Sequence, residues 1–263
     1  VVDDAFEYLM RKSSKGEKGQ FFTPRTIVDF MVALLDPEEG EIICDPCCGS
    51  GGFLIKAFEY VREKIEDDIQ KIKEQIKAHL FDEKYESLSG KKRAEVDKRV
   101  DEYFTALNKE LDTSHEGGRL RQLSHDCIFG TDANPRMART AKMNMIMHGD
   151  GHGGVHHHDG LININGIFEN HFDVILTNPP FGANVGKDQI IDEYDLESDD
   201  KRIAHYTKLY GQEYKSQLDD LKRRAQGLTV DGEKKDKEKL LLNLYETGKM
   251  STLTEVLFIE RCL

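Results

Sequence analysis

The chain has 263 residues, of which 38% are hydrophobic, so it can bury the core of one large domain or two small ones. No apolar run approaches the ~20 residues that cross a bilayer, and the opening "VVDDAFEYLMRKSS" lacks the apolar centre of a signal peptide. The net charge of −12 argues against non-specific nucleic-acid binding by the whole surface. It leaves open a local basic groove, or a basic partner that supplies the DNA contacts.

The cysteine count indicates the compartment. Five cysteines, an odd number, occur without a secretory signal, which predicts free thiols in a reducing cytoplasm. They are Cys44, Cys47, Cys48, Cys127 and Cys262. The first residue is not Met, and "TEVLFIERCL" stops inside an apolar-periodic stretch, so we expect a truncated chain.

The segment "GEKGQFFTPRTIVDFMVALLDP" predicts the first helix. Thr23 is the expected N-cap, Pro24 the first helical position, and the helix should end before Pro37. The residues that recur at helical spacing are Thr26, Ile27, Phe30, Met31 and Leu34.

The segment "EIICDPCCGSGGFLIKAFEYV" predicts a strand at 42–44, a glycine turn, and a helix from near Phe53. Its apolar residues continue in a heptad-like stripe: Leu54, Phe58, Val61, Ile65, Ile69, Ile72, Ile76 and Leu80. After "YESLSGKK" a second stripe follows: Val96, Val100, Tyr103 or Phe104, Leu107 and Leu111. The pattern predicts a protruding antiparallel helical hairpin within 63–125. A self-packed insertion with solvated faces is favoured over an arm that docks a partner.

The α/β alternation resumes after the hairpin. Ile128 and Phe129 predict a strand that ends at Asp132, and Pro135 opens a helix. "VHHHDGLI" and "FDVILTNPPF" predict a third and a fourth strand. Loops and helices are expected in the charged stretch 183–250, with another helix starting within 251–263. This rhythm predicts a parallel sheet flanked by helices, with an unfinished edge.

Ligands of open parallel sheets bind beyond the carboxyl ends of the strands, where four candidate groups fall. The first is "DPCCGSGG", whose Gly49, Gly51 and Gly52 let backbone approach a ligand closely. Its spacing matches neither the dinucleotide fingerprint nor the phosphate loop. Asp45 therefore suits a cationic group such as an amino acid ammonium. The alternative is a glycine turn that only permits helix packing.

Two further carboxylates follow strands. Asp132 is placed to hold ribose hydroxyls, or else to cap the helix at Pro135. Asp159 is placed to accept a hydrogen bond from the exocyclic amine of adenine. We expect no metal site, because the cysteines are not near the histidines in sequence and a solvated glycine-histidine loop is favoured. Those histidines are His148, His152, His156, His157 and His158.

The fourth group is "NPPF". The residue before a proline is held extended, and the two prolines remove N–H donors. What remains is rich in acceptors, namely the Asn178 side-chain oxygen and the Pro179 carbonyl. Two acceptors suit a substrate amine, and Phe181 offers a face for a planar ring. The alternative is a rigid turn.

Taken together, "GQFFTPR", "DPCCGSGGFL", "GTDANPRMARTAKMNMIMHG" and "ILTNPPF" resemble adenine-N6 DNA methyltransferases that use S-adenosylmethionine. The resemblance is greatest to the modification subunit of type I restriction–modification systems, and it covers 19–62, 126–181 and 251–263. It implies that residues 1–263 are a fragment of a catalytic domain with the Rossmann-like class I methyltransferase fold. The hairpin between Asp45 and Asp132 departs from the family's usual spacing.

The resemblance also implies site roles. The residues that would close over the methionine part of the cofactor are Gln20, Phe21, Phe22, Thr23, Pro24 and Arg25. Those that would hold its amino acid end are Asp45, Gly49, Ser50 and Gly51. Asp132 would bind the ribose, and Asp159 with Leu161 would lie near the cofactor adenine. The catalytic edge, facing a flipped-out target adenine, would be Asn178, Pro179, Pro180 and Phe181.

The implied partners are DNA, a specificity subunit, a second modification subunit and a restriction subunit. Two alternatives stay open at this point. One is methylation of another amide or amine, such as a protein glutamine, against which "GQFFTPR" argues. The other is a non-catalytic assembly module whose cofactor site has lost its function.

Overall fold

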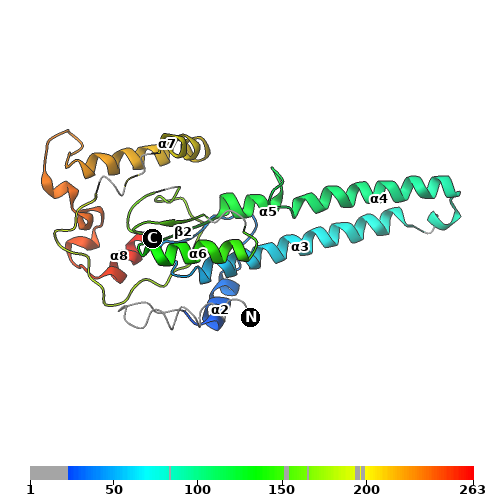
Figure 1. Cartoon of the computed structure of the whole chain (residues 1–263), viewed down its shortest axis with the longest axis horizontal. Coiled ribbons are helices and arrows are strands. Elements are labelled where there is room, and N and C mark those ends of the chain that lie inside the picture. Colours follow the sequence, from blue (N-terminus) through cyan, green and yellow to red (C-terminus); the bar gives the residue numbers. More distant parts are fainter. Residues whose placement is uncertain (1–22, 83, 151–153, 165, 193–195, 197–198) are drawn as a thin grey trace.

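The computed structural model describes residues 23–82, 84–150, 154–164, 166–192, 196 and 199–263. These form an α/β core from which a long helical hairpin projects (Figure 1). The strands are β1 (Ile43–Asp45), β2 (Ile128–Asp132), β3 (Val155–His157) and β4 (Val174–Ile175). They make one sheet in the order β3-β2-β1-β4, and every pair is parallel.

The strand register aligns the carboxyl ends of the central strands. Asp45 of β1 pairs with Gly130 of β2, and Asp132 pairs with His157 of β3. The turns that leave these strands therefore all open at one edge of the sheet, as predicted for a ligand site.

Helices surround the sheet and connect its strands. The α-helices are α2 (Arg25–Leu35), α3 (Gly52–Leu80), α4 (Gly90–Glu110), α5 (Arg119–Gln122), α6 (Pro135–Met147), α7 (Asp200–Ala225) and α8 (Thr254–Cys262). Shorter helical turns are η1 (Tyr85–Ser87), η2 (Leu123–Cys127), η4 (Asp236–Lys239), η5 (Leu241–Leu244) and η6 (Thr247–Lys249).

Alternate strand residues point to opposite faces, and each face has its own apolar core. Ile43 and Ile128 pack with the buried residues of α2, α3 and α6. Cys44 and Phe129 face the other side, where Ile167 and Tyr210 of α7 contact them. The sheet is thus covered on both faces, as a parallel sheet requires.

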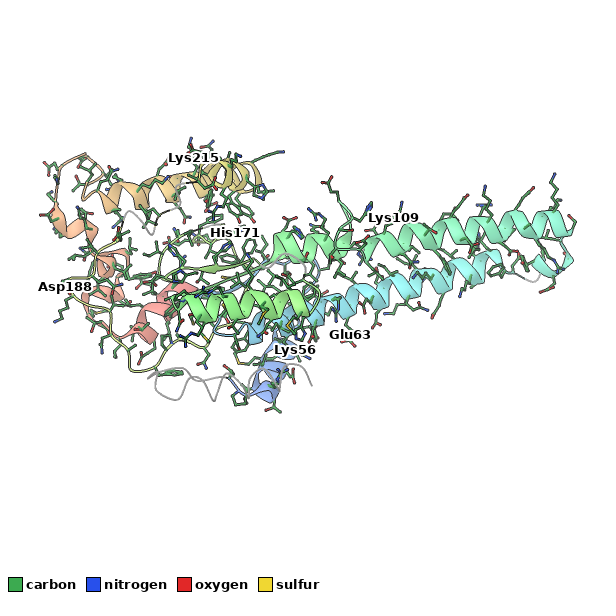
Figure 2. All side chains as sticks on the ribbon, in the orientation of Figure 1. Lys56, Glu63, Lys109, His171, Asp188 and Lys215 are labelled. Atoms are coloured by element: carbon green, nitrogen blue, oxygen red, sulfur yellow. The ribbon has the colours of Figure 1, made fainter. Side chains whose placement is uncertain are left out.

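The predicted hairpin is confirmed as α3 and α4. Ile69 is buried along the seam, and farther out Lys73 Nζ donates to Asn108 Oδ1 at 2.7 Å. Charged side chains such as Glu63 and Lys109 project from it into solvent (Figure 2). Because α3 runs antiparallel to the strands, the hairpin extends away from the α8 end of the molecule (Figure 1). The apolar stripe of the hairpin packs between its own two helices.

Two details of the first helix were predicted wrongly. Pro24 occupies the N-cap position, one residue before the helix, and Thr23 does not cap it. The buried residues are Val28 and Val32, whereas Ile27, Phe30 and Leu34 are exposed. The helix has apolar residues on more than one side, and packing against α3, rather than periodicity, selects the side that is buried.

The prediction of a solvated histidine loop holds only for His157, which is exposed, and His152 lies outside the described residues. His148 Nδ1 lies 2.7 Å from Glu59 Oε1. His156 and His157 belong to β3, and His158 is buried beside Asp159, with its Nδ1 2.9 Å from the Asp159 carbonyl oxygen. Among the described helices, none is both long and apolar enough to cross a membrane.

Candidate active site

A cavity of about 650 Å³ lies at the carboxyl ends of the strands. The predicted site residues that line it are Gly49, Asp132, Asp159, Leu161, Asn178, Pro179, Pro180 and Phe181. A second cavity, of about 60 Å³, is lined by Thr23, Asp45, Gly49, Ser50 and Asn178 among others. Because Gly49 and Asn178 line both, the two cavities are neighbours. Four sequence segments predicted separately thus meet in one place.

The glycine turn joins β1 to α3. Gly51 has a φ of 89°, in the left-handed region that favours glycine. A Cβ there would also lie 3.3 Å from Cβ of Ala141, so a side chain would press on α6. Asp132 holds the turn from β2, because Gly49 N donates to Asp132 Oδ2 at 2.9 Å. The turn therefore serves the site as well as helix packing.

The possibility that Asp132 caps α6 is excluded. Asn134 is the N-cap residue, and its side chain accepts from Arg136 N. The second Asp132 oxygen accepts from Asn134 N at 2.8 Å. Burial raises the pKa of Asp132, a carboxyl group that lines the larger cavity.

Asp45 is a buried carboxyl group beside the smaller cavity, with an exposed fraction of 1%. Its Oδ1 accepts from Thr177 Oγ1 at 2.8 Å and from Cys47 N at 3.1 Å. Among the described residues, no Lys, Arg or His lies within ion-pair distance of it. Burial therefore raises the pKa of Asp45 to about 7. A cationic ligand would supply the missing charge, which fits the ammonium of S-adenosylmethionine.

Asn178 lies where the two cavities meet. Its side-chain Nδ2 donates to Thr23 Oγ1 at 3.0 Å, so Thr23 binds the donor end of the carboxamide. The Oδ1 atom is then available as an acceptor. Phe181, three residues on, is 60% exposed, so one of its ring faces is accessible from solvent.

Of the predicted site residues that precede β1, not all lie at the cavities. Gln20, Phe21 and Phe22 lie outside the described residues. Thr23 is at the site, whereas Pro24 and Arg25 are exposed at the start of α2 and line neither cavity.

Sequence reasoning missed several lining residues. Val185 and Gln189 come from the charged stretch after "NPPF", and Thr254 and Phe258 come from α8. They belong to no recognisable motif, and only tertiary structure brings them to the cavity. Within the described residues, no three His, Cys, Asp or Glu side chains are grouped as metal ligands.

The strand order, the glycine turn after β1 and the acidic residues after β2 and β3 define the class I methyltransferase form of the Rossmann-like fold. The family model described as N-6 DNA Methylase matches residues 1–209. The chain belongs to this family.

Curated relatives are methylase subunits of type I restriction enzymes. The EcoEI subunit of Escherichia coli is 41% identical over 80 residues, covering 29% of this chain and 16% of that protein. The StySPI subunit of Salmonella potsdam is 26% identical over 190 residues, covering 70% of this chain and 28% of that protein. The chain thus spans less than a third of the length of these relatives.

A similar solved structure is a modification subunit of a putative type I restriction enzyme from Vibrio vulnificus YJ016. It is 27% identical, with a TM-score of 0.42, and the match covers 69% of this chain and 28% of that one.

Proposed function

We propose that the chain carries the S-adenosylmethionine site and the catalytic edge of an adenine-N6 DNA methyltransferase. The observation that carries the proposal is the position of Asn178. Its carboxamide is held by Thr23 at the meeting point of the two cavities, with its oxygen free to accept. The family match supports the same chemistry.

The cofactor would lie across both cavities. Asp45 would bind its ammonium, because the buried carboxylate has no other cation among the described residues. Asp132 would bind the ribose hydroxyls. Asp159, two residues before Leu161, would accept a hydrogen bond from the exocyclic amine of the adenine. When bound, S-adenosylmethionine supplies a methyl group on a good leaving group, the sulfonium. Together, these acidic side chains fix its orientation.

The target adenine would be flipped out of the duplex, since its amine is inaccessible within the stack. The Asn178 side-chain oxygen and the Pro179 carbonyl would accept the two amine hydrogens, which draws the nitrogen lone pair out of conjugation with the ring. Neither Pro179 nor Pro180 has a backbone N–H that would compete. Phe181 would stack on the base, which contributes about 1–3 kcal/mol. Catalysis is then mostly a matter of positioning.

The names of the relatives support a place in a type I restriction–modification complex. We propose that this chain acts as its modification subunit, with DNA, a specificity subunit, a second modification subunit and a restriction subunit as partners. The five cysteines, all unpaired in the structure, suit a reducing cytoplasm.

The test is methylation of unmethylated DNA by the natural full-length protein with its specificity subunit. Asn178→Ala should abolish methyl transfer while the affinity for S-adenosylhomocysteine, measured by calorimetry, stays unchanged. Asn108→Ala is the matched control, because Asn108 lies on the hairpin, where it pairs with Lys73. Methylation by the Asn178→Ala protein at the normal rate would refute the role given to this side chain.

A further inference from the structure

The loop Asp159–Leu161 lies in the cavity wall just beyond the last ladder bond of the sheet, in which His158 N donates to the Asp132 carbonyl at 3.1 Å. β3 ends at His157, two residues before the loop begins. Within the loop, Leu161 N donates to Asp159 Oδ1 at 3.0 Å, and Ile162 N donates to the Asp159 carbonyl at 3.1 Å. These bonds shape a local turn. They do not fix where the turn sits relative to the rest of the cavity.

On one side the loop is pressed against the turn after β1. A Cβ at Gly160 would lie 1.8 Å from the Pro46 carbonyl oxygen and 3.2 Å from a ring carbon of Phe258. Only glycine permits this approach. Pro46 directly follows Asp45, so the contact sets the spacing between the two predicted ends of the cofactor.

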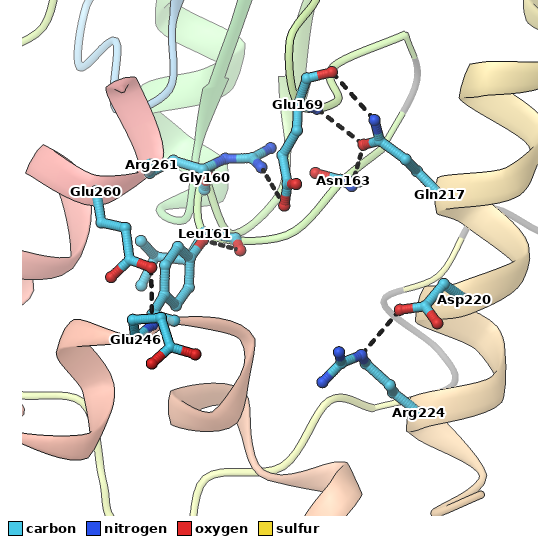
Figure 3. Close-up of polar contacts among 11 residues, drawn as sticks. Gly160, Leu161, Asn163, Glu169, Gln217, Asp220, Arg224, Glu246, Glu260 and Arg261 are labelled. Atoms are coloured by element: carbon cyan, nitrogen blue, oxygen red, sulfur yellow. Dashed lines mark hydrogen bonds and ion pairs between the residues drawn. The ribbon is translucent and has the colours of Figure 1, made fainter. Parts of the chain in front are cut away.

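The loop is also held by two side chains from later in the chain. Tyr245 Oη donates to the Leu161 carbonyl at 2.5 Å, and Arg261 Nε donates to the Gly160 carbonyl at 3.2 Å (Figure 3). Tyr245 is 6% exposed, and so is the side chain of Arg261. Beyond His158, these contacts therefore take the place of further ladder bonds.

The two side chains are themselves linked through α8. Glu260, beside Arg261, accepts from Glu246 N at 2.7 Å (Figure 3). It also accepts from Thr247 N at 2.8 Å. The segment that carries Tyr245 is thus fastened to the helix that carries Arg261. Both donors approach the loop from a single packed unit.

We propose that Tyr245 and Arg261 are positioning residues for recognition of the cofactor adenine. By holding the loop through its carbonyl oxygens, they set the place at which Asp159 meets the exocyclic amine. The inference rests on the proposed function, and it adds Tyr245, which directly follows η5, and Arg261 of α8 to the cofactor site.

The test uses the full-length natural protein and two ligands. One is S-adenosylhomocysteine, and the other is S-inosylhomocysteine, in which an oxygen replaces the amine that Asp159 would recognise. Tyr245→Phe keeps the ring and removes the hydroxyl. We expect it to weaken binding of the adenine compound about tenfold, and binding of the inosine compound less than about twofold. Discrimination between the two ligands therefore falls.

Tyr85→Phe is the matched control. The Tyr85 hydroxyl donates a similarly short bond, 2.6 Å to Asp97, but on the hairpin. Its removal should leave both affinities unchanged. Arg261→Lys, which keeps the charge and loses the Nε donor, should repeat the effect of Tyr245→Phe. If thermal unfolding shows that Tyr245→Phe prevents folding, the result for Arg261→Lys tests the proposal instead.

The outcomes separate the two proposals. If the wild-type protein binds neither ligand, the proposed function fails and the inference with it. If the wild type discriminates and the folded variants discriminate equally well, the inference alone is refuted. Equal loss of both affinities in the variants also refutes it, because that result indicates a general structural role.

Discussion

The side chains of Thr23 and Asn178 are joined by a hydrogen bond of 3.0 Å, although 155 residues separate them in sequence. Thr23 was expected to cap α2, but its hydroxyl instead accepts from the Asn178 amide. Thr23, two residues before the first described helix, therefore determines which end of the Asn178 carboxamide faces the cavities. The proposed catalytic edge thus depends on both its own motif and a distant one.

Thr23→Val removes this acceptor while keeping the shape of the side chain. The carboxamide is then free to rotate, so we expect kcat for DNA methylation to fall about tenfold, in line with one lost hydrogen bond. Thr23→Ser restores the hydroxyl and should keep most of the activity. Steady-state kinetics at saturating cofactor measure both. A wild-type kcat in Thr23→Val would contradict the proposed role of Thr23.

Gly160→Ala should be among the most damaging single substitutions. The added Cβ would overlap the Pro46 carbonyl, so the loop or β1 must shift. We expect a loss of at least about 3 kcal/mol in the free energy of unfolding, together with loss of cofactor binding. Gly90→Ala is the control: Gly90 opens α4, and a Cβ there meets nothing within 4 Å. Denaturant unfolding should show it to be neutral or slightly stabilised.

The buried carboxyl of Asp45 predicts a pH dependence of stability. Its pKa is 3.8 in the unfolded chain and about 7 in the folded one. Between these values the folded state holds a proton that the unfolded state has lost, so stability falls as pH rises from about 4 to 7. The resulting loss in the free energy of unfolding approaches about 4 kcal/mol, at 1.36 kcal/mol per unit of pKa. Asp45→Asn should lack this slope and be the more stable protein at pH 8.

The same carboxyl must be ionised to bind an ammonium group. Affinity for S-adenosylhomocysteine should therefore increase up to tenfold per pH unit below the pKa of Asp45, and level off above it. Calorimetry across pH 5.5 to 8 measures the trend. A flat profile in the wild-type protein would argue that another group binds the ammonium.

The distal hairpin should be dispensable for the cofactor. Replacing residues 78–103 with a short glycine-serine turn keeps Lys73 opposite Asn108. Because the hairpin extends away from the cavity, we expect cofactor affinity to stay within about twofold and the melting temperature to change little. An affinity loss above tenfold would show that the hairpin supports the site.

The sequence was most informative where periodicity and motifs agree. The heptad stripe of α3 predicted the hairpin because its apolar positions, such as Ile65 and Ile69, are buried in the seam between helices. Asp132 and Asp159 were placed at strand ends because parallel strands share one carboxyl edge. These features depend on local pattern and sheet geometry, which a single sequence contains.

The rest depends on which segments pack together. Apolar residues on several sides of α2 left its buried face undetermined, and Phe30 is exposed. Tyr245 and Arg261 contact the loop Asp159–Leu161 from positions that no local pattern marks. Thr23 took a partner from a distant motif rather than the local role its sequence position favoured.

The loop at Gly160 also bears on the time at which the site forms. Its partner Tyr245 lies 84 residues after Leu161, a stretch that a ribosome adds in about 4 to 17 s. Arg261, 101 residues after Gly160, emerges later still. The four described strands are complete once β4 is made, but the loop Asp159–Leu161 gains its two side-chain anchors only after α8 has left the ribosome. During synthesis these strands therefore precede the proposed cofactor site, and contacts of such long sequence separation are the slowest to close.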